Sequence, residues 1–182
     1  MPDRSVALFR GINVGKAKRV AMAGLRKLFL TLGYSEVQTL LNSGNVVFTP
    51  SDDSSAKAAG RIEKALTETH GISARVTVLT AKELRTIVAE ISLQNLADNP
   101  SRLLVSVVRD KAELKKLNAL KRKKWGDEAF AVGSRVAYLW CPHNILESPL
   151  ADAVGRALGD SVTARNWATI LKLLALVDGN SR

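Results

Sequence analysis

The sequence predicts an α+β protein made of two small subdomains, residues 1–95 and 101–182, that share one order of elements. In each half, short apolar runs with strand propensity alternate with stretches whose apolar residues recur at helical spacing. The order is strand, helix, hairpin, helix, strand and a further helix, and a polar break around Asn99–Pro100 separates the halves. This is the order of the ferredoxin-like βαββαβ unit. We therefore expect two ferredoxin-like subdomains packed together, each an antiparallel sheet with helices on one face, and a C-terminal helix.

Each element of the first half has its own start or stop signal. The apolar run Val6–Phe9 has strand propensity, and the glycines at 11 and 15 end it. The residues Asn-Ser-Gly-Asn at 42–45 separate two strand-like runs and have the chemistry of a hairpin turn. Ser54 or Ser55 can cap a helix that Gly71 ends. The predicted elements are a strand at 6–9, a helix from 20 to 33, a hairpin of 37–41 and 46–48, a helix from 54 to 70, a strand at 74–79 and a helix at 81–91.

The second half repeats this order without repeating the sequence. Its hairpin is expected to turn at Gly133–Ser134. Pro149 is typical of the first turn of a helix, which Gly159 ends, and Asn166 can cap the last helix. The predicted elements are a strand at 103–108, a strongly basic helix at 112–124, a hairpin over 129–140, a helix from 149 to 159, a short strand at 162–163 and a final helix that carries Ile170, Leu173 and Val177 on one side.

The predicted topology brings separate polar segments to one edge of the first sheet. In a ferredoxin-like sheet, strand one lies between strands three and four and is antiparallel to both, so its C-terminal end meets the start of strand three. The residues Gly11–Asn13 should therefore face the turn at Ser43–Asn45. The first helix opens at the same edge, with the cations of Lys16–Arg19 before it. Cations are unfavourable at a helix N-terminus, so an anion shared with them would relieve a conflict.

The charge of the chain favours an anionic partner. Lys+Arg number 27 against 17 Asp+Glu, a net charge of +10, of which residues 1–50 carry +5, residues 51–100 carry −1 and residues 101–182 carry +6. A basic protein attracts nucleic acid and phosphorylated ligands by electrostatic steering and counterion release. The single cysteine, Cys141, cannot form an internal disulfide, and no apolar stretch resembles a leader or a membrane span. We expect a cytoplasmic protein without a membrane partner.

The segment Arg10–Arg19 gathers two glycines, an amide and four cations between a strand and a helix, and we interpret it as part of a binding site. It is neither G-x-G-x-x-G nor a Walker loop, because Lys16 is followed by Ala17, which has no hydroxyl for Mg²⁺. Tight-turn geometry explains the glycines equally well. For Ser43–Asn45 we favour turn formation, and for Asn166 we favour helix capping, although side chains that the turn does not use can still face a ligand. The candidate ligand-binding residues are Arg10, Gly11, Asn13, Gly15, Lys16, Lys18, Arg19, Ser43, Gly44, Asn45, Arg165 and Asn166.

The sequence contains no recognisable catalytic constellation, and it indicates no metal ion and no cofactor. His70 and His143 lack partners at metal-ligand spacing. Asp52–Asp53 is better explained by helix capping than by paired-carboxylate catalysis, and Cys141 is better explained as a half-buried structural thiol than as a nucleophile. The run Lys121–Trp125 is either a solvated helix end or a contact for a nucleic-acid backbone with a stacking tryptophan.

Three ordered motifs carry a resemblance to a known family. They are Arg10-Gly-Ile-Asn-Val-Gly15, Ser43-Gly-Asn-Val46 with Phe48, and Thr163-Ala-Arg-Asn-Trp167 followed by Thr169 and Lys172-Leu173. Together they resemble a bacterial family known as domain of unknown function 1697, over essentially the whole chain. The resemblance implies an α+β fold of two small subdomains and no established activity, substrate or cofactor. The family pattern has a second glycine where this chain has Lys16, so the resemblance implies no ligand role for Lys16.

Three classes of function follow from these patterns. The leading hypothesis is a cytoplasmic binding protein with a basic polar rim for an anionic ligand, above all nucleic acid. The second is an enzyme acting on a small phosphorylated or nucleotide-like substrate, which Arg10, Asn13, Asn45 and Arg165 would orient electrostatically. The third is a protein-interaction module. An enclosed pocket would favour the enzyme, and a broad open basic face would favour nucleic acid.

Overall fold

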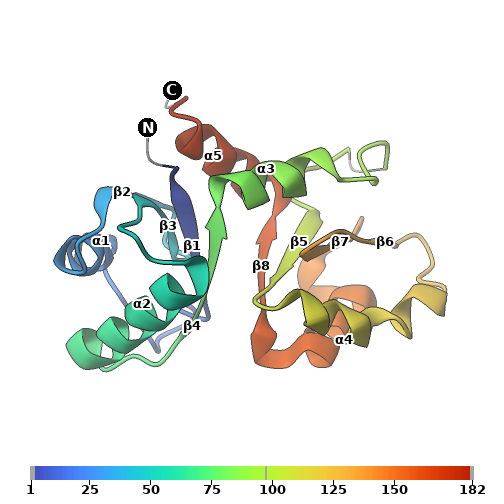
Figure 1. Cartoon of the computed structure of the whole chain (residues 1–182). Helices are drawn as coiled ribbons and strands as arrows, with labels where there is room; N and C mark the ends of the chain where they lie inside the picture. Colours follow the sequence, from blue (N-terminus) through green and yellow to red (C-terminus); the bar gives the residue numbers. More distant parts are fainter. Residues whose placement is uncertain (1–2, 97, 181–182) are drawn as a thin grey trace. The chain divides into compact units, whose positions relative to one another are not determined.

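The computed structural model describes residues 3–96 and 98–180, which form two four-stranded antiparallel sheets with flanking helices (Figure 1). The α+β class and the C-terminal helix are therefore confirmed. The chain divides into two compact units, one of Met1–Leu84 with Leu173–Arg182 and one of Arg85–Lys172. The division falls within α3 (Ala81–Ala89) and within the C-terminal helix α5 (Trp167–Val177). In the described part of the chain, no helix is long and apolar enough to span a bilayer.

The first unit contains a sheet of strand order β2-β3-β1-β4. Its strands are β1 (Ser5–Arg10), β2 (Ser35–Leu40), β3 (Asn45–Thr49) and β4 (Arg75–Thr80). The first strand lies between the third and the fourth and is antiparallel to both, as predicted, with Leu8 opposite Asn45 on one side and Thr77 on the other. Every residue of β1 from Ser5 to Phe9 is buried, which explains why this strand reads as a continuous apolar run.

Two helices, α1 (Met22–Thr31) and α2 (Ser55–His70), pack against one face of this sheet. Phe29 of α1 lies among three other rings, with its centroid 5.1 Å from that of Phe48, 5.9 Å from that of Tyr34 and 6.2 Å from that of Phe9. These aromatic residues belong to a core cluster that includes Leu25 and Leu28 of α1 and Ile62 and Leu66 of α2. Phe9 and Phe48 are both fully buried in this cluster.

The ends of α2 follow the sequence signals, but the role predicted for its preceding carboxylates is wrong. Ser54 caps the helix by accepting a hydrogen bond from the Lys57 amide, and Gly71 ends it in the left-handed conformation. The nearly fully buried carboxylate of Asp53 instead pairs with Lys57 and Arg61 of α2 and accepts a hydrogen bond from the Tyr34 hydroxyl. The chain uses Asp53 to join α2 to the aromatic core, because the adjacent serine already satisfies the helix end.

The hairpin turn between β2 and β3 packs closely against β1 and the residues that follow it. The Phe9 amide donates a hydrogen bond of 2.9 Å to the carbonyl of Gly44, whose φ is +81°. A Cβ atom at Gly44 would lie 2.6 Å from Cδ1 of Ile12 and 2.7 Å from Cβ of Phe9. The glycine is therefore required both by its backbone conformation and by the close approach of the neighbouring strand.

The second unit contains a sheet of strand order β6-β7-β5-β8, the same arrangement as in the first unit. Its strands are β5 (Leu103–Val108), β6 (Ala129–Val132), β7 (Val136–Trp140) and β8 (Val162–Asn166). The helix α4 (Pro149–Leu158) has proline in its first turn and Gly159 after its last residue, as predicted. Short 3₁₀ segments cover Ile145–Glu147 (η3) and Gly159–Ser161 (η4).

The basic α-helix predicted for residues 112–124 is wrong. The chain there forms two 3₁₀ segments, η1 (Lys111–Leu117) and η2 (Leu120–Arg122). Buried leucines recur at every third position, namely Leu114, Leu117 and Leu120, and join the core of the second unit. A 3₁₀ helix has three residues per turn, so this spacing places all three side chains on one face, whereas an α-helix would spread them.

We predict that Gly44→Ala destabilises the protein by about 2–4 kcal/mol, because the new methyl group adds overpacking to the cost of a left-handed backbone. Equilibrium denaturation in urea, followed by circular dichroism, measures the change. Gly71→Ala is the matched control: its φ is +64°, but no atom lies within 4 Å of the added Cβ. It should cost only about 1 kcal/mol, and equal losses in the two variants would contradict the packing argument.

We predict that Asp53→Asn lowers the melting temperature at neutral pH. Hydrogen bonds from Lys57, Arg61 and Tyr34 hold the pKa of the Asp53 carboxyl below its usual range. A depressed pKa stabilises the folded state above the unfolded pKa of about 3.9, and this stabilisation is lost as the pH falls through the folded pKa. The gap between wild type and variant should therefore close in strong acid.

Thermal unfolding of both proteins at neutral pH and below about pH 3 measures this gap. Asp52→Asn removes a neighbouring, exposed carboxylate and serves as the control. A gap for Asp53→Asn that is the same at both pH values would argue against the ion-pair cluster.

Candidate functional site

The segment that joins β1 to α1, residues 11–21, forms a compact loop with an unusual backbone; we call it the β1–α1 loop. Gly11, Asn13, Gly15 and Lys18 all have positive φ, at +71°, +55°, +63° and +52°. The Asn13 amide donates to the Lys18 carbonyl at 3.0 Å, so the loop closes on itself. Two of these residues carry side chains: asparagine tolerates the left-handed conformation, whereas at Lys18 it costs about 1–2 kcal/mol. Conformations of this kind are concentrated at functional sites.

The side chain of Asn13 connects the β1–α1 loop to the hairpin turn. Its Nδ2 donates to the carbonyl of Val20 at 2.9 Å and to the carbonyl of Asn42 at 2.8 Å, and its Oδ1 accepts from the Val20 amide at 2.8 Å. The expectation that the residues after strand one face the hairpin turn is therefore confirmed. These bonds also mean that the Asn13 amide serves the loop itself.

The side chain of Asn45 stabilises the turn itself. Its side chain is fully buried, and its Nδ2 donates to the Leu40 carbonyl at 2.8 Å and to Oγ of Ser43 at 3.0 Å. Turn formation and ligand contact were both open for Ser43 and Asn45, and these contacts favour turn formation. The groups that remain to meet a ligand are therefore cationic side chains and loop backbone.

Four cations surround the β1–α1 loop. Lys16, Lys18 and Arg19 are exposed, and Nη2 of Arg19 donates to the Gly15 carbonyl at 3.0 Å, which holds the guanidinium across the loop. Arg10 ends β1 directly opposite Arg75 of β4. Two cations facing each other across strands are unfavourable unless negative charge lies nearby, and Glu63 supplies it, with Oε2 3.6 Å from Nη1 of Arg75. The positive charge concentrated at this edge is therefore that of Lys16, Lys18 and Arg19.

The helix that follows the loop begins without a cap. Its N-cap residue is Ala21, no described side chain hydrogen-bonds to its first amides, and its first turn contains no acidic residue. Free N–H groups and the helix dipole make such an end attractive to anions. A cavity of about 440 Å³ opens here, lined by Asn13, Arg19, Val20, Ala21, Met22 and Asn42.

Four of these lining residues, Val20, Ala21, Met22 and Asn42, are not among those predicted from the sequence. The sequence signal that could have identified this helix start is Ala21, because the residue at an N-cap position is normally Ser, Thr, Asp or Asn. Asn42 could not be singled out, since its backbone carbonyl rather than its amide meets Asn13.

The last two predicted residues, Arg165 and Asn166, end β8 in the second unit, whereas the other ten lie in the first. Oδ1 of Asn166 accepts from the amide and the hydroxyl of Thr169 at 2.9 and 2.8 Å, so it caps α5 as predicted. Burial lowers the pKa of the Arg165 guanidinium to about 10, which still leaves it charged at neutral pH.

The other groups considered from the sequence have structural partners. The indole of Trp125 donates to the Leu120 carbonyl at 3.1 Å and packs against the core of the second unit, so its ring is not poised to stack on a base. Cys141 is fully buried, with Sγ 3.4 Å from Oγ of Ser148, and burial raises the pKa of its thiol. This is opposite to what a nucleophilic cysteine needs. His143 pairs with Asp127 at 2.5 Å on the surface.

Comparisons with known proteins agree with the fold. Among solved structures, the chain is similar to a conserved bacterial protein, SP0830 from Streptococcus pneumoniae, with a TM-score of 0.76 and 21% identity over 96% of this chain and 98% of that one. This identity supports the fold alone. No curated protein matches the chain.

The family model described as "Protein of unknown function (DUF1697)" matches residues 3–138. The match includes the β1–α1 loop and the hairpin turn, while the motif at Thr163–Trp167 lies outside it. Because the match covers most of the chain, the protein belongs to the DUF1697 family.

Proposed function

We propose that this protein binds an anionic ligand, above all nucleic acid, at the β1–α1 loop. The observation that carries the proposal is the cavity beside the start of α1, where Arg19 and the uncapped helix end meet. Unsatisfied amides, the positive end of a helix dipole and exposed cations together match the chemistry of a phosphate group.

The exposure of the site favours an extended ligand over a small enclosed one. Arg19, Ala21 and Asn42 of the cavity wall are exposed, as are the neighbouring Lys16 and Lys18. A phosphodiester backbone can follow such a surface, contacting one cation after another and releasing counterions. The amides of Asn13 and Asn45 then act as supports that hold the loop and the turn in place, rather than as ligand contacts.

The fold fits this role as a scaffold. We propose that residues 1–95 and 101–182 are two ferredoxin-like subdomains, which the shared strand order, with the first strand between the third and the fourth, supports. Such a sheet places the loop after its first strand beside the hairpin between its second and third strands. The binding residues therefore come from two connections that a rigid sheet keeps together.

An enzyme acting on a small phosphorylated or nucleotide-like substrate is the second candidate. The cavity volume of about 440 Å³ lies within the range of small-molecule sites, and this observation favours it. A substrate in that cavity would lie between the α1 amides and Arg19.

We predict that the protein binds labelled single- or double-stranded oligonucleotides and that salt weakens this binding. The double variant Lys16→Gln with Arg19→Gln should bind them less tightly. Each lost phosphate contact reduces the slope of log K against log salt by about 0.7–0.9, so the double variant should lose about 1.4–1.8 units of slope. Fluorescence anisotropy at several salt concentrations measures both affinity and slope.

A control variant, Lys64→Gln with Arg156→Gln, removes the same charge from α2 and α4 and should bind like wild type. Absence of binding at low salt, or binding that ignores both salt and the loop variant, would refute the nucleic-acid proposal. A mononucleotide that binds as tightly as the oligonucleotide and depends on Arg19 would favour the small-substrate enzyme instead.

A further inference from the structure

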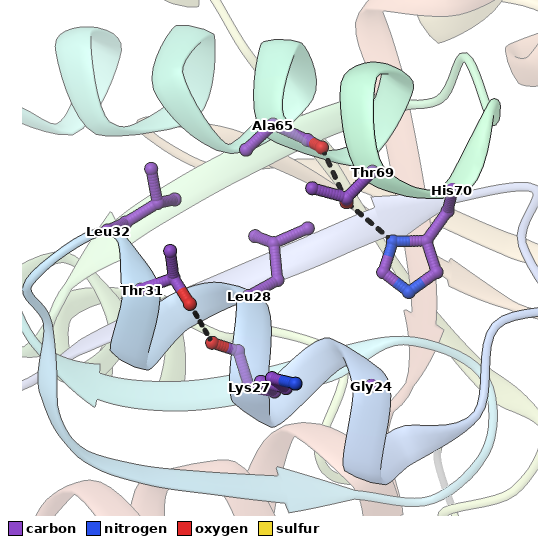
Figure 2. Close-up of a pocket in the computed structure, with 8 residues that line it drawn as sticks. All are labelled: Gly24, Lys27, Leu28, Thr31, Leu32, Ala65, Thr69 and His70. Carbon is purple, nitrogen blue, oxygen red and sulfur yellow. Dashed lines mark hydrogen bonds between the residues drawn. The ribbon is translucent and has the colours of Figure 1, made fainter.

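A second hollow in the first unit, between α1 and α2, has a different chemistry from the loop site; we call it the helix groove (Figure 2). Its volume is about 320 Å³, at the lower end of the range of small-molecule sites. It shares no lining residue with the cavity at the β1–α1 loop. An inference about this groove therefore does not depend on the proposed function.

The walls of the helix groove are mainly apolar. Leu28 and Leu32 point from α1 toward α2, and Ala65 faces them with a side chain too small to fill the space between the helices (Figure 2). Sites for small molecules are typically apolar surfaces of this kind with a few well-placed polar groups.

Two threonines in the groove contribute little polarity, because their hydroxyls bond to their own helices. Oγ1 of Thr31 donates to the Lys27 carbonyl at 3.0 Å, and Oγ1 of Thr69 donates to the Ala65 carbonyl at 2.7 Å. The polar chemistry left for a ligand is that of Lys27 and His70.

The imidazole of His70 is held in a defined orientation at one end of the groove. Its Nδ1 lies 2.7 Å from Oγ1 of Thr69. Since the hydroxyl proton of Thr69 is directed to the Ala65 carbonyl, Nδ1 is the donor in this contact, which leaves Nε2 directed toward α1. Nε2 accepts a hydrogen bond when the ring is neutral and donates one when the ring is protonated.

Gly24 makes room for this ring. A Cβ atom at Gly24 would lie 3.1 Å from Nε2 of His70, which is tighter than ordinary packing. Glycine inside a helix costs about 1 kcal/mol relative to alanine. In α1 this residue keeps the end of the groove open beside the histidine (Figure 2).

The electrostatics of the groove favour a negative charge. None of the eight residues that line it is acidic, and in the described part of the chain no group pairs with the ammonium of Lys27. The nearest acid along α2, Glu68, pairs with Lys64 at 3.8 Å. An apolar trough with two nitrogen bases and no acid complements an apolar molecule with one anionic head.

We propose that the helix groove binds a small carboxylic acid with an apolar, ring-sized body. The body packs against Leu28, Leu32 and Ala65, and the carboxylate accepts hydrogen bonds from the Lys27 ammonium. Sugar phosphates and nucleotides do not fit, because most of the groove offers them no hydrogen-bond partner.

Titration of the full chain with naphthoate and with naphthamide, its neutral isostere, tests the proposal by two-dimensional NMR and calorimetry. Naphthoate should shift the amide signals of Gly24, Lys27 and Ala65, and it should bind about fivefold more tightly than naphthamide, the contribution of one partly exposed ion pair. Lys27→Gln should remove this preference and leave naphthamide binding unchanged. Lys172→Gln, an exposed lysine of α5 outside the groove, is the matched control and should change neither.

Ala65→Leu fills the groove and should weaken both probes at least about tenfold. Shifts mapped on the wild-type protein locate the site even if this variant folds poorly. Absence of shifts at the groove, equal affinity for acid and amide, or full binding to a folded Ala65→Leu protein would each overturn the proposal.

Discussion

The side chain of Asn13 connects three segments of the first unit: the β1–α1 loop, the backbone before α1 and the turn between β2 and β3. Through three hydrogen bonds of 2.8–2.9 Å, this single side-chain amide closes the loop and attaches it to the hairpin turn. A carbonyl or an N–H that lost its partner here would need water in its place. Asn13 also has a φ of +55°, so its backbone turns the loop while its side chain holds the loop closed. These contacts determine the positions of Arg19 and of the start of α1.

That arrangement leaves positive charge concentrated at the loop. Amide side chains satisfy the internal backbone of the loop and the turn, while the charged side chains of the loop, Lys16, Lys18 and Arg19, are all cationic and exposed. The amides that begin α1 directly after them have no capping side chain among the described residues. Each of these two features is unfavourable alone, and the same anion would improve both. That one anion would stabilise these features together is the physical argument for a ligand, because ordinary surface lysines do not require a bound anion.

Much of the fold could be predicted because its signals are local. Turn chemistry at 42–45, the serine cap and terminal glycine of α2, and the proline and glycine around α4 each act within a few residues. The segment 111–122 could not be predicted as 3₁₀ helix from composition, because its lysines and alanine suit an α-helix and only the triplet spacing of its leucines distinguishes the two. For the site, topology alone predicted that the β1–α1 loop meets the turn. The sequence could not show whether an asparagine binds a ligand or the backbone, since the same amide suits both.

The loop cavity and the helix groove both border α1, and the local weakness of this helix explains why. It lacks a capping side chain at its start. Its neighbour α2 has a serine cap, a left-handed terminal glycine and ion pairs from Lys57 and Arg61 to the buried carboxylate of Asp53. Tertiary packing of Leu25, Leu28 and Phe29 must therefore hold α1 in place. A helix held by its buried face can leave its end and its exposed side unoptimised, and those are the surfaces from which a ligand site can be built.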